Sequence, residues 1–300
     1  MYLLVTGASG HIGSAIANEC NKNKIKTFLL TRSKKKEKIL KKRFKNCITL
    51  NYQTFKNNKK PISFIIHTAS LNDQESNNNK NAIKDSLDIT KKILSLMNLN
   101  NLKKIIYLSS AQVYGSNLVS KVSENTKEKA INNYGFSRLA NEKFLEKISR
   151  KLKFSLYIIR ISNVVGDPII FDKRCLRLLP NDIKNQAKKN FTICLRSSGL
   201  QSRNFISLQT TAKSIIELIK LKSKGVKKYN LGGINTTVIS FVKKFISFYE
   251  KKNKKKIRLI IKSNNPKKVK KLIYESNKIK KLLKFKKKES LSFIVKNFLR

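Results

Sequence analysis

The chain has 300 residues, 40% of them hydrophobic, which is enough to bury a core in one large domain or two small ones. Its formal net charge is +50, from 67 lysines and arginines against 17 acidic residues. No apolar run approaches the ~20 residues of a membrane span, and the four scattered cysteines form no CxxC pair, so the sequence argues against a membrane protein, a disulfide framework and a zinc site.

The first element is an apolar run at residues 2–6 that leads into three glycines at three-residue spacing. Gly7, Gly10 and Gly13 lie between this expected strand and an expected helix at 12–22. The missing side chains at Gly7 and Gly10 let backbone N–H groups approach a pyrophosphate, whose charge the helix dipole favours, and Gly13 lets the helix pack close to the strand. We therefore expect a nucleotide-cofactor site here; an ordinary glycine-rich turn is the alternative.

Strands and helices alternate along the next part of the chain. We expect strands at 2–6, 26–31, 47–50, 62–67, 104–109 and 155–160, and helices at 12–22, 34–43, 81–97 and 134–150. This order is typical of an α/β fold with a doubly wound parallel sheet, the Rossmann arrangement. Polar loops or exposed turns are expected at 72–81, 253–256 and 264–268.

The alternation weakens after residue 167, which predicts two domains. An NAD(P)-binding Rossmann domain would cover 1–167, and 203–233 would return to it. A smaller mixed C-terminal substrate-binding domain would cover 168–300.

The second strand ends on Thr31 and Arg32, about 19 residues past the last glycine. A carboxylate at this place would hold the ribose 2′-hydroxyl of NAD, whereas an arginine can accept a 2′-phosphate. Arg32 therefore favours NADP(H) as the cofactor and leaves NAD(H) open. The alternative is one more surface cation in a very basic chain.

Two hydroxyl groups follow the strand at 104–109. Ser110 lies where this strand ends, which is where ligands bind in open α/β sheets. Tyr134 opens the helix at 134–150, and Arg138 follows one turn later on the same face. A cation there would stabilise a phenolate and make Tyr134 a usable base near neutral pH.

With these motifs in this order, nearly the whole chain resembles a known family, the extended short-chain dehydrogenase/reductases of the NAD(P)-dependent epimerase/dehydratase type, which act on nucleotide sugars. The matching segments are 6–13, 66–70, 109–115, 134–142, 160–166, 203–206, 229–233 and 276–283. The activity that this resemblance implies is 4-epimerisation of a nucleotide-diphosphate sugar through a transient keto-sugar.

The resemblance also implies a role for each matching residue. Tyr134 would take a proton from a sugar hydroxyl while hydride leaves the same carbon for the nicotinamide, Ser110 would hydrogen-bond that oxygen, and Arg138 would complete the catalytic set. Asn163 and Arg203 would hold the substrate's diphosphate. The cofactor would be surrounded by Gly7, Gly10, His11, Ile12, Gly13, Arg32, Asn51, Tyr52, Thr68, Ala69, Ser70 and Arg138.

Two departures from the family pattern affect the expected activity. The family usually has lysine where this chain has Arg138; arginine keeps the charge but cannot take part in a lysine-like proton relay. Dehydrating members place acidic residues directly after the catalytic hydroxyl, whereas Ala111 and Gln112 follow here, which disfavours a dehydratase. The alternatives to an epimerase are an NADP-dependent reductase of a keto-sugar or similar carbonyl, and a catalytically weakened cofactor-binding protein.

The remaining expectations concern partners and location. The basic residues are 56 lysines and only 11 arginines, spread along the chain, whereas proteins that read nucleic acid depend on arginine. We therefore expect a nucleotide-sugar substrate, with no specific nucleic acid, membrane or metal, and a homodimer remains open. Because the chain opens on a strand and its cysteines suit a reducing compartment, we expect no signal peptide and a cytoplasmic location.

Overall fold

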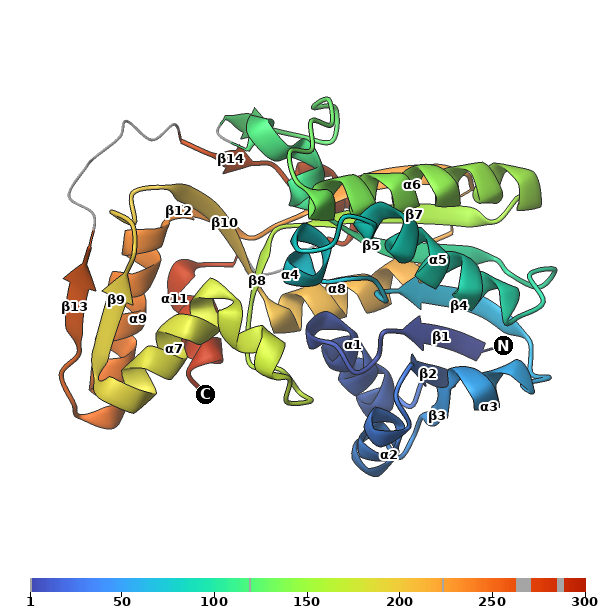
Figure 1. Cartoon of the computed structure of the whole chain (residues 1–300), viewed down its shortest axis with the longest axis horizontal. Helices are drawn as coiled ribbons and strands as arrows, with labels where there is room; N and C mark the ends of the chain where they lie inside the picture. Colours follow the sequence, from blue (N-terminus) through green and yellow to red (C-terminus); the bar gives the residue numbers. More distant parts are fainter. Residues whose placement is uncertain (1, 119, 223, 263–270, 285–288) are drawn as a thin grey trace.

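The computed structural model describes residues 2–118, 120–222, 224–262, 271–284 and 289–300 (Figure 1). At its centre is a sheet of seven parallel strands, which confirms the predicted α/β class. From one edge to the other the strands are β11 (Val226–Leu231), β7 (Ser155–Ile161), β5 (Lys104–Ser110), β4 (Ile62–His67), β1 (Tyr2–Thr6), β2 (Thr27–Thr31) and β3 (Ile48–Asn51).

Helices cover both faces of this sheet because its strands are apolar on both sides. Successive residues of a strand point to opposite faces, so Leu3 and Val5 join one core while Leu4 joins the other. The first core is closed by α1 (His11–Lys22), α2 (Lys34–Arg43), α8 (Leu208–Lys220) and α10 (Asn277–Leu282). The second core is closed by α3 (Tyr52–Lys56), α5 (Ala82–Ser95) and α6 (Asn133–Leu152).

A smaller region lies beside the carboxyl ends of the strands (Figure 1). It has a three-stranded sheet of β12 (Ile234–Thr237), β10 (Ser202–Ser207) and β8 (Asn163–Val165), and a parallel pair of β13 (Arg258–Ile261) and β9 (Thr192–Leu195). This region has a core of its own, which includes Phe205, Phe241 and Phe245. The helices that contribute to this core are α7 (Leu179–Asn190), α9 (Val238–Asn253) and α11 (Leu291–Phe298). A third small pairing joins β14 (Ile273–Tyr274) to β6 (Lys121–Val122).

The predicted strands and long helices agree with the structure to within a few residues at their ends. The polar loop predicted at 72–81 is wrong, because residues 73–77 form the short helix α4 (Asp73–Asn77). The Asn72 side chain accepts from the Glu75 amide while the Glu75 side chain accepts from the Asn72 amide, a capping box that stabilises the first turn. The turn at 253–256 follows α9, where Lys254 is left-handed, and 264–268 lies outside the described residues.

Helices α7 to α11 were not predicted, and neither were three short helices that precede them. The three short helices are α3, η1 (Ala111–Asn117) and η2 (Lys173–Arg177). Each begins at an Asx or serine side chain that accepts from a backbone N–H, respectively Asn51, Ser110 and Asp172. Two of these three helices, η1 and η2, bear directly on the candidate site.

One lysine is held inside the molecule. Lys104 is 4% exposed, and its ammonium group donates to the carbonyl oxygens of Leu218, Ile219 and Leu221 at the end of α8. A positive charge is stabilising there because the helix dipole places negative charge at this end. Burial lowers the pKa of Lys104. Within the described ranges, no helix is long and apolar enough to span a bilayer.

Candidate active site

The loop between β1 and α1 contains two of the predicted glycines, Gly7 and Gly10, and the third, Gly13, lies in the first turn of α1. Gly7 has a φ of +63°, and a Cβ on Gly13 would lie 2.2 Å from the Gly7 carbonyl oxygen. The fold itself therefore requires glycine at both positions. Gly10 differs: among the described residues that are not its chain neighbours, only the Gly7 oxygen comes within 4 Å of an added Cβ, at 3.3 Å. The space beside Gly10 is open for a ligand.

This loop opens into a cleft of about 330 Å³ at the carboxyl ends of β1, β2 and β4. Gly10 also begins α1, whose first turn carries no acidic residue, so the positive end of the helix dipole faces this region uncompensated. Of the predicted cofactor residues, those that line the cleft are Gly7, Gly10, Arg32, Tyr52, Thr68, Ala69 and Ser70. Two cations that were not predicted, Lys36 and Arg174, line it as well.

The other predicted cofactor residues, His11, Ile12, Gly13, Asn51 and Arg138, do not line this cleft. The His11 ring donates from Nε2 to the Gly166 carbonyl oxygen at 2.8 Å, and burial lowers the pKa of His11. Asn51 caps α3 and donates to the Glu37 carboxylate at 2.6 Å. Both side chains hold the walls of the site together.

Ser110 and Tyr134 lie on elements that are in contact. Ser110 ends β5, and its side chain accepts from the Gln112 amide at the start of η1. A Cβ on Gly135 would lie 2.7 Å from the Gln112 carbonyl oxygen. The missing side chain at Gly135 therefore lets the first turn of α6, with Tyr134, approach the residues that follow Ser110.

Arg138 connects the tyrosine to the cofactor cleft. Its guanidinium carbon lies 4.7 Å from the centre of the Tyr134 ring, a cation–π contact, and the side chain is buried. It donates to the carbonyl oxygens of Leu108 in β5, at 3.4 Å, and of Leu71, at 3.2 Å. Leu71 directly follows the cleft-lining segment 68–70. One cation thus links the tyrosine, the end of β5 and the cleft wall.

A buried histidine whose role the sequence analysis missed links the four elements β1, β4, α5 and α6. His67 bonds to the Thr6 hydroxyl through Nδ1 at 2.8 Å and to the Thr90 hydroxyl through Nε2 at 3.0 Å. Thr90 in turn donates to Asn141 on α6 at 2.5 Å. Burial, with the Arg138 charge, lowers the pKa of His67 to about 3, so the ring is neutral at physiological pH.

The two predicted substrate residues are neighbours. Asn163 on β8 and Arg203 on β10 are joined by a bond of 3.4 Å from the Arg203 guanidinium to the Asn163 side-chain oxygen. Among the described residues, no carboxylate forms an ion pair with Arg203. Burial lowers the pKa of Arg203. A partly buried guanidinium without a carboxylate is suited to bind an anion.

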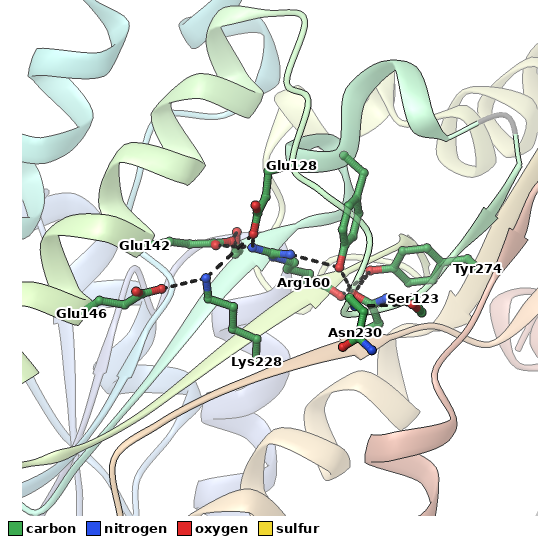
Figure 2. Close-up of polar contacts among 11 residues, drawn as sticks. Ser123, Glu128, Glu142, Glu146, Arg160, Lys228, Asn230 and Tyr274 are labelled. Atoms are coloured by element: carbon green, nitrogen blue, oxygen red, sulfur yellow. Dashed lines mark hydrogen bonds and ion pairs between the residues drawn. The ribbon is translucent and has the colours of Figure 1, made fainter.

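A buried arginine of β7 binds Glu142 on α6 (Figure 2). Arg160 in β7 is 0% exposed and binds both oxygens of Glu142, at 3.1 and 2.7 Å, and the carboxylate of Glu128. Glu142 also accepts from the hydroxyl of Ser109 at 2.5 Å. Because Ser109 precedes Ser110 and Glu142 lies one turn after Arg138, this cluster fixes the strand end and the helix that carry the predicted catalytic residues.

The same cluster extends toward the C-terminal part of the chain. The Tyr114 hydroxyl accepts from Arg160 at 3.0 Å and donates to Asn230 at 2.8 Å, while the Tyr274 hydroxyl donates to the Arg160 carbonyl oxygen at 2.8 Å (Figure 2). Burial raises the pKa of Tyr274, so it remains a donor. Outside the gaps in the described chain, no three His, Cys, Asp or Glu side chains gather to hold a metal ion.

The family model described as the NAD dependent epimerase/dehydratase family matches residues 3–232. Among curated proteins, the dTDP-D-glucose 4,6-dehydratase of Homo sapiens is 30% identical over 152 residues, which is 50% of this chain and 42% of that protein. A putative UDP-glucose 4-epimerase of Methanocaldococcus jannaschii is 29% identical over 257 residues, 79% of this chain and 78% of that protein. The alignments to the human, bovine and mouse dehydratases thus span less than half of those proteins.

Solved structures share the fold along the whole chain. UDP-glucose 4-epimerase from Bifidobacterium longum, in complex with NAD⁺ and UDP, has a TM-score of 0.78 and 22% identity, and the alignment covers 100% of this chain and 97% of that one. UDP-glucose-4-epimerase from Stenotrophomonas maltophila, with bound NAD, has a TM-score of 0.81 and 16% identity, with 99% and 96% covered.

Proposed function

The chain belongs to the NAD dependent epimerase/dehydratase family, and on that premise we propose that it is a 4-epimerase of a nucleotide-diphosphate sugar that uses a bound nicotinamide dinucleotide. The observation that carries the proposal is the position of Arg138. Its guanidinium lies over the Tyr134 ring and donates to Leu108 and Leu71. This single side chain brings the tyrosine, the end of β5 and the cofactor cleft together.

The residues of the cleft fit a dinucleotide. The open space beside Gly10 and the uncompensated start of α1 suit a diphosphate, and cations line the same cleft. A dinucleotide held by these residues would supply the reversible acceptance and return of hydride that inversion at a single sugar carbon requires.

The chain's own residues would handle the proton. Tyr134 takes the proton of the sugar hydroxyl as the keto-sugar forms and gives it back as the inverted hydroxyl is restored. Ser110 hydrogen-bonds the same oxygen. Arg138 stabilises the negative charge on the tyrosine oxygen, and its own charge persists because guanidinium does not lose its proton in proteins.

Arg203 and Asn163 would hold the substrate's diphosphate. The guanidinium of Arg203 lacks a carboxylate partner among the described residues, and Asn163 orients it. An anion bound there forms charge-assisted hydrogen bonds and offsets the cost of burying the charge.

A second candidate function is an NADP-dependent reductase of a keto-sugar or similar carbonyl. Arg32 lines the cleft at the end of β2, where NAD-binding sites carry a carboxylate. This position of Arg32 supports a preference for NADP(H). The nucleotide that co-purifies with the protein separates the two functions, because tightly held NAD supports the epimerase and an empty site that takes up NADPH supports the reductase.

The catalytic assignment is tested with Tyr134→Phe, Arg138→Lys and a distant control, Tyr229→Phe. Turnover of UDP-, dTDP- and ADP-linked sugars is followed by proton NMR after each variant is loaded with cofactor. Tyr134→Phe should remove nearly all turnover and leave folding and cofactor affinity intact. Arg138→Lys should retain activity, because lysine supplies the charge that the family normally uses, and the control should match the wild type.

Wild-type rates in Tyr134→Phe would refute the base assignment. If the wild type turns over no nucleotide sugar or carbonyl that it binds, the chain is a catalytically weakened cofactor-binding protein.

A further inference from the structure

A chain of ion pairs lies at the cofactor cleft. The Lys36 ammonium binds the Asp172 carboxylate at 3.0 Å, and Asp172 binds Arg174 through both oxygens, at 3.0 and 2.6 Å. The Arg174 guanidinium then binds Glu75 at 2.7 Å. We name these four residues the ion-pair strap.

Sheet topology determines what the strap crosses. Lys36 lies in α2, which follows β2, and Glu75 lies in α4, which follows β4. In the sheet, β1 runs between β2 and β4. A connection between the helices that follow the two neighbours of β1 therefore passes over its carboxyl end, where the loop from Gly7 to Gly10 begins. Both cations of the strap line the cleft that this loop opens into.

We propose that the ion-pair strap retains the dinucleotide by closing over its diphosphate, with Arg174 as the residue that binds the phosphate oxygens. The inference rests on the proposed function for its ligand. It goes further in assigning control of cofactor release to residues 172 and 174, which come from the smaller region rather than from the glycine loop.

Two features of the strap keep it closed, and a third allows the Arg174–Glu75 pair to separate. Glu75 is fixed in the capping box of α4, where its second oxygen accepts from the Asn72 amide at 2.9 Å. The Arg174 guanidinium holds the pKa of the Asp172 carboxyl well below its usual range, so this link stays ionised in mild acid. The Arg174 and Glu75 side chains are 45% and 35% exposed, so water can separate that pair at modest cost.

Arg174 has donors to spare for the ligand. Within the described part of the chain, three of its N–H groups are donated to carboxylates, one from each of its nitrogens. Arginine carries five such groups, so two N–H groups remain for phosphate oxygens. The two carboxylates therefore position the guanidinium without using up its capacity to donate.

Retention matters for the chemistry. An epimerase returns hydride to the sugar from which it came, so its cofactor has no reason to leave between turnovers. A reductase must exchange its cofactor in every turnover. A closed strap over the diphosphate is suited to the first kind of enzyme.

The decisive experiment is the rate of NADH release from Glu75→Gln, measured by stopped-flow fluorescence as excess NAD displaces NADH. Glutamine keeps the capping-box acceptor and removes only the charge that binds Arg174. The strap predicts release about fivefold faster, the factor that corresponds to about 1 kcal/mol for such a pair. Simple point-charge electrostatics predicts the opposite sign, because removing a carboxylate makes the cleft more attractive to an anion.

Two further variants complete the design. Lys36→Gln breaks the other end of the strap and should also speed release, whereas Glu217→Gln, which removes the exposed Lys220–Glu217 pair of α8, should leave the rate unchanged. Raising the salt concentration weakens the attraction of the cleft for the anionic cofactor in every variant. It also weakens the ion pairs of the strap, but only in proteins whose strap is intact. The release rate of the wild type should therefore rise more steeply with salt than that of Glu75→Gln.

Unchanged or slower release from Glu75→Gln, with NADH still bound, overturns the strap and leaves the proposed function intact. A wild type that binds no dinucleotide at all overturns both.

Discussion

Two arginines of this protein each bind two carboxylates, yet their surroundings differ. Arg160 is 0% exposed and binds Glu142, also 0% exposed, together with Glu128 (Figure 2). Arg174 is 45% exposed and binds Asp172 and Glu75. The Arg160 cluster joins elements of the sheet and α6, whereas the strap joins two helices across a cleft.

The difference in burial separates two uses of the same chemistry. A buried charge that loses its partner pays the full cost of desolvation, so opening the Arg160 cluster would strongly destabilise the fold. A half-exposed pair exchanges its partner for water at little cost. The Arg160 cluster therefore fixes the position of the predicted catalytic residues, and the strap is suited to open and close.

The largest expected effect is on stability. Arg160→Met should lower the free energy of unfolding by about 3–5 kcal/mol, because it leaves Glu142 buried without a counter-charge. Arg174→Met should lower it by no more than about 1 kcal/mol. Urea unfolding followed by circular dichroism measures both.

The double variant Arg160→Met/Glu142→Leu is the control for this comparison. It should recover part of the loss, because no unpaired charge remains in the interior. Equal losses in Arg160→Met and Arg174→Met would remove the distinction between the two clusters.

The glycine loop and the Tyr134–Arg138 pair could be predicted because both follow from local spacing. Three glycines after an apolar run, and two residues four apart on a helix, place their atoms without any knowledge of the rest of the fold. The helix α4 was missed although Asn72 and Glu75 stand at capping-box spacing, because the polar composition of 72–81 suggested a loop.

The two arginine clusters could not be predicted from local patterns. Glu75 and Arg174 are 99 residues apart in the chain, and Tyr114 and Asn230 are 116 apart. In a chain of 67 basic residues, nothing in the sequence separates Arg160 from a surface cation except its place in an apolar strand. Only the tertiary fold brings these residues together.

A smaller effect should appear with pH. Burial lowers the pKa of His67 to about 3, well below the ordinary value near 6.5, so the unfolded state binds a proton that the folded state rejects. Stability is therefore complete above pH 6.5 and falls as the pH drops toward 3. This histidine should contribute a slope that approaches about 1.4 kcal/mol per pH unit below pH 6.

His67→Gln isolates this contribution, since an amide can still bond to Thr6 and Thr90. Its unfolding free energy, measured from pH 6.5 to 5, should be less pH-dependent than that of the wild type. Asp172 should contribute little in this range, because its lowered pKa keeps it ionised in the folded state and the ordinary aspartate pKa of 3.8 keeps it ionised in the unfolded state. A slope unchanged by His67→Gln would mean that the ring is protonated inside the fold.

The smallest expected effect is that of salt on the two arginine variants. Between 0.05 and 0.5 M salt, the stability cost of Arg174→Met should shrink toward zero, because the exposed pairs are screened. The cost of Arg160→Met should stay constant, because ions do not reach the interior. Parallel salt dependences in the two variants would show that both clusters are equally accessible to solvent.

The rate at which Lys104 reacts with an acylating reagent should report how often the interior of the molecule opens. Within the described residues, Lys104 is the one buried lysine, and its ammonium group donates to three carbonyl oxygens at the end of α8. An acylating reagent should modify the surface amines within minutes and reach Lys104 only when β5 and α8 separate. Mass spectrometry of the peptide containing residue 104 would therefore time the opening of the sheet without any engineered label.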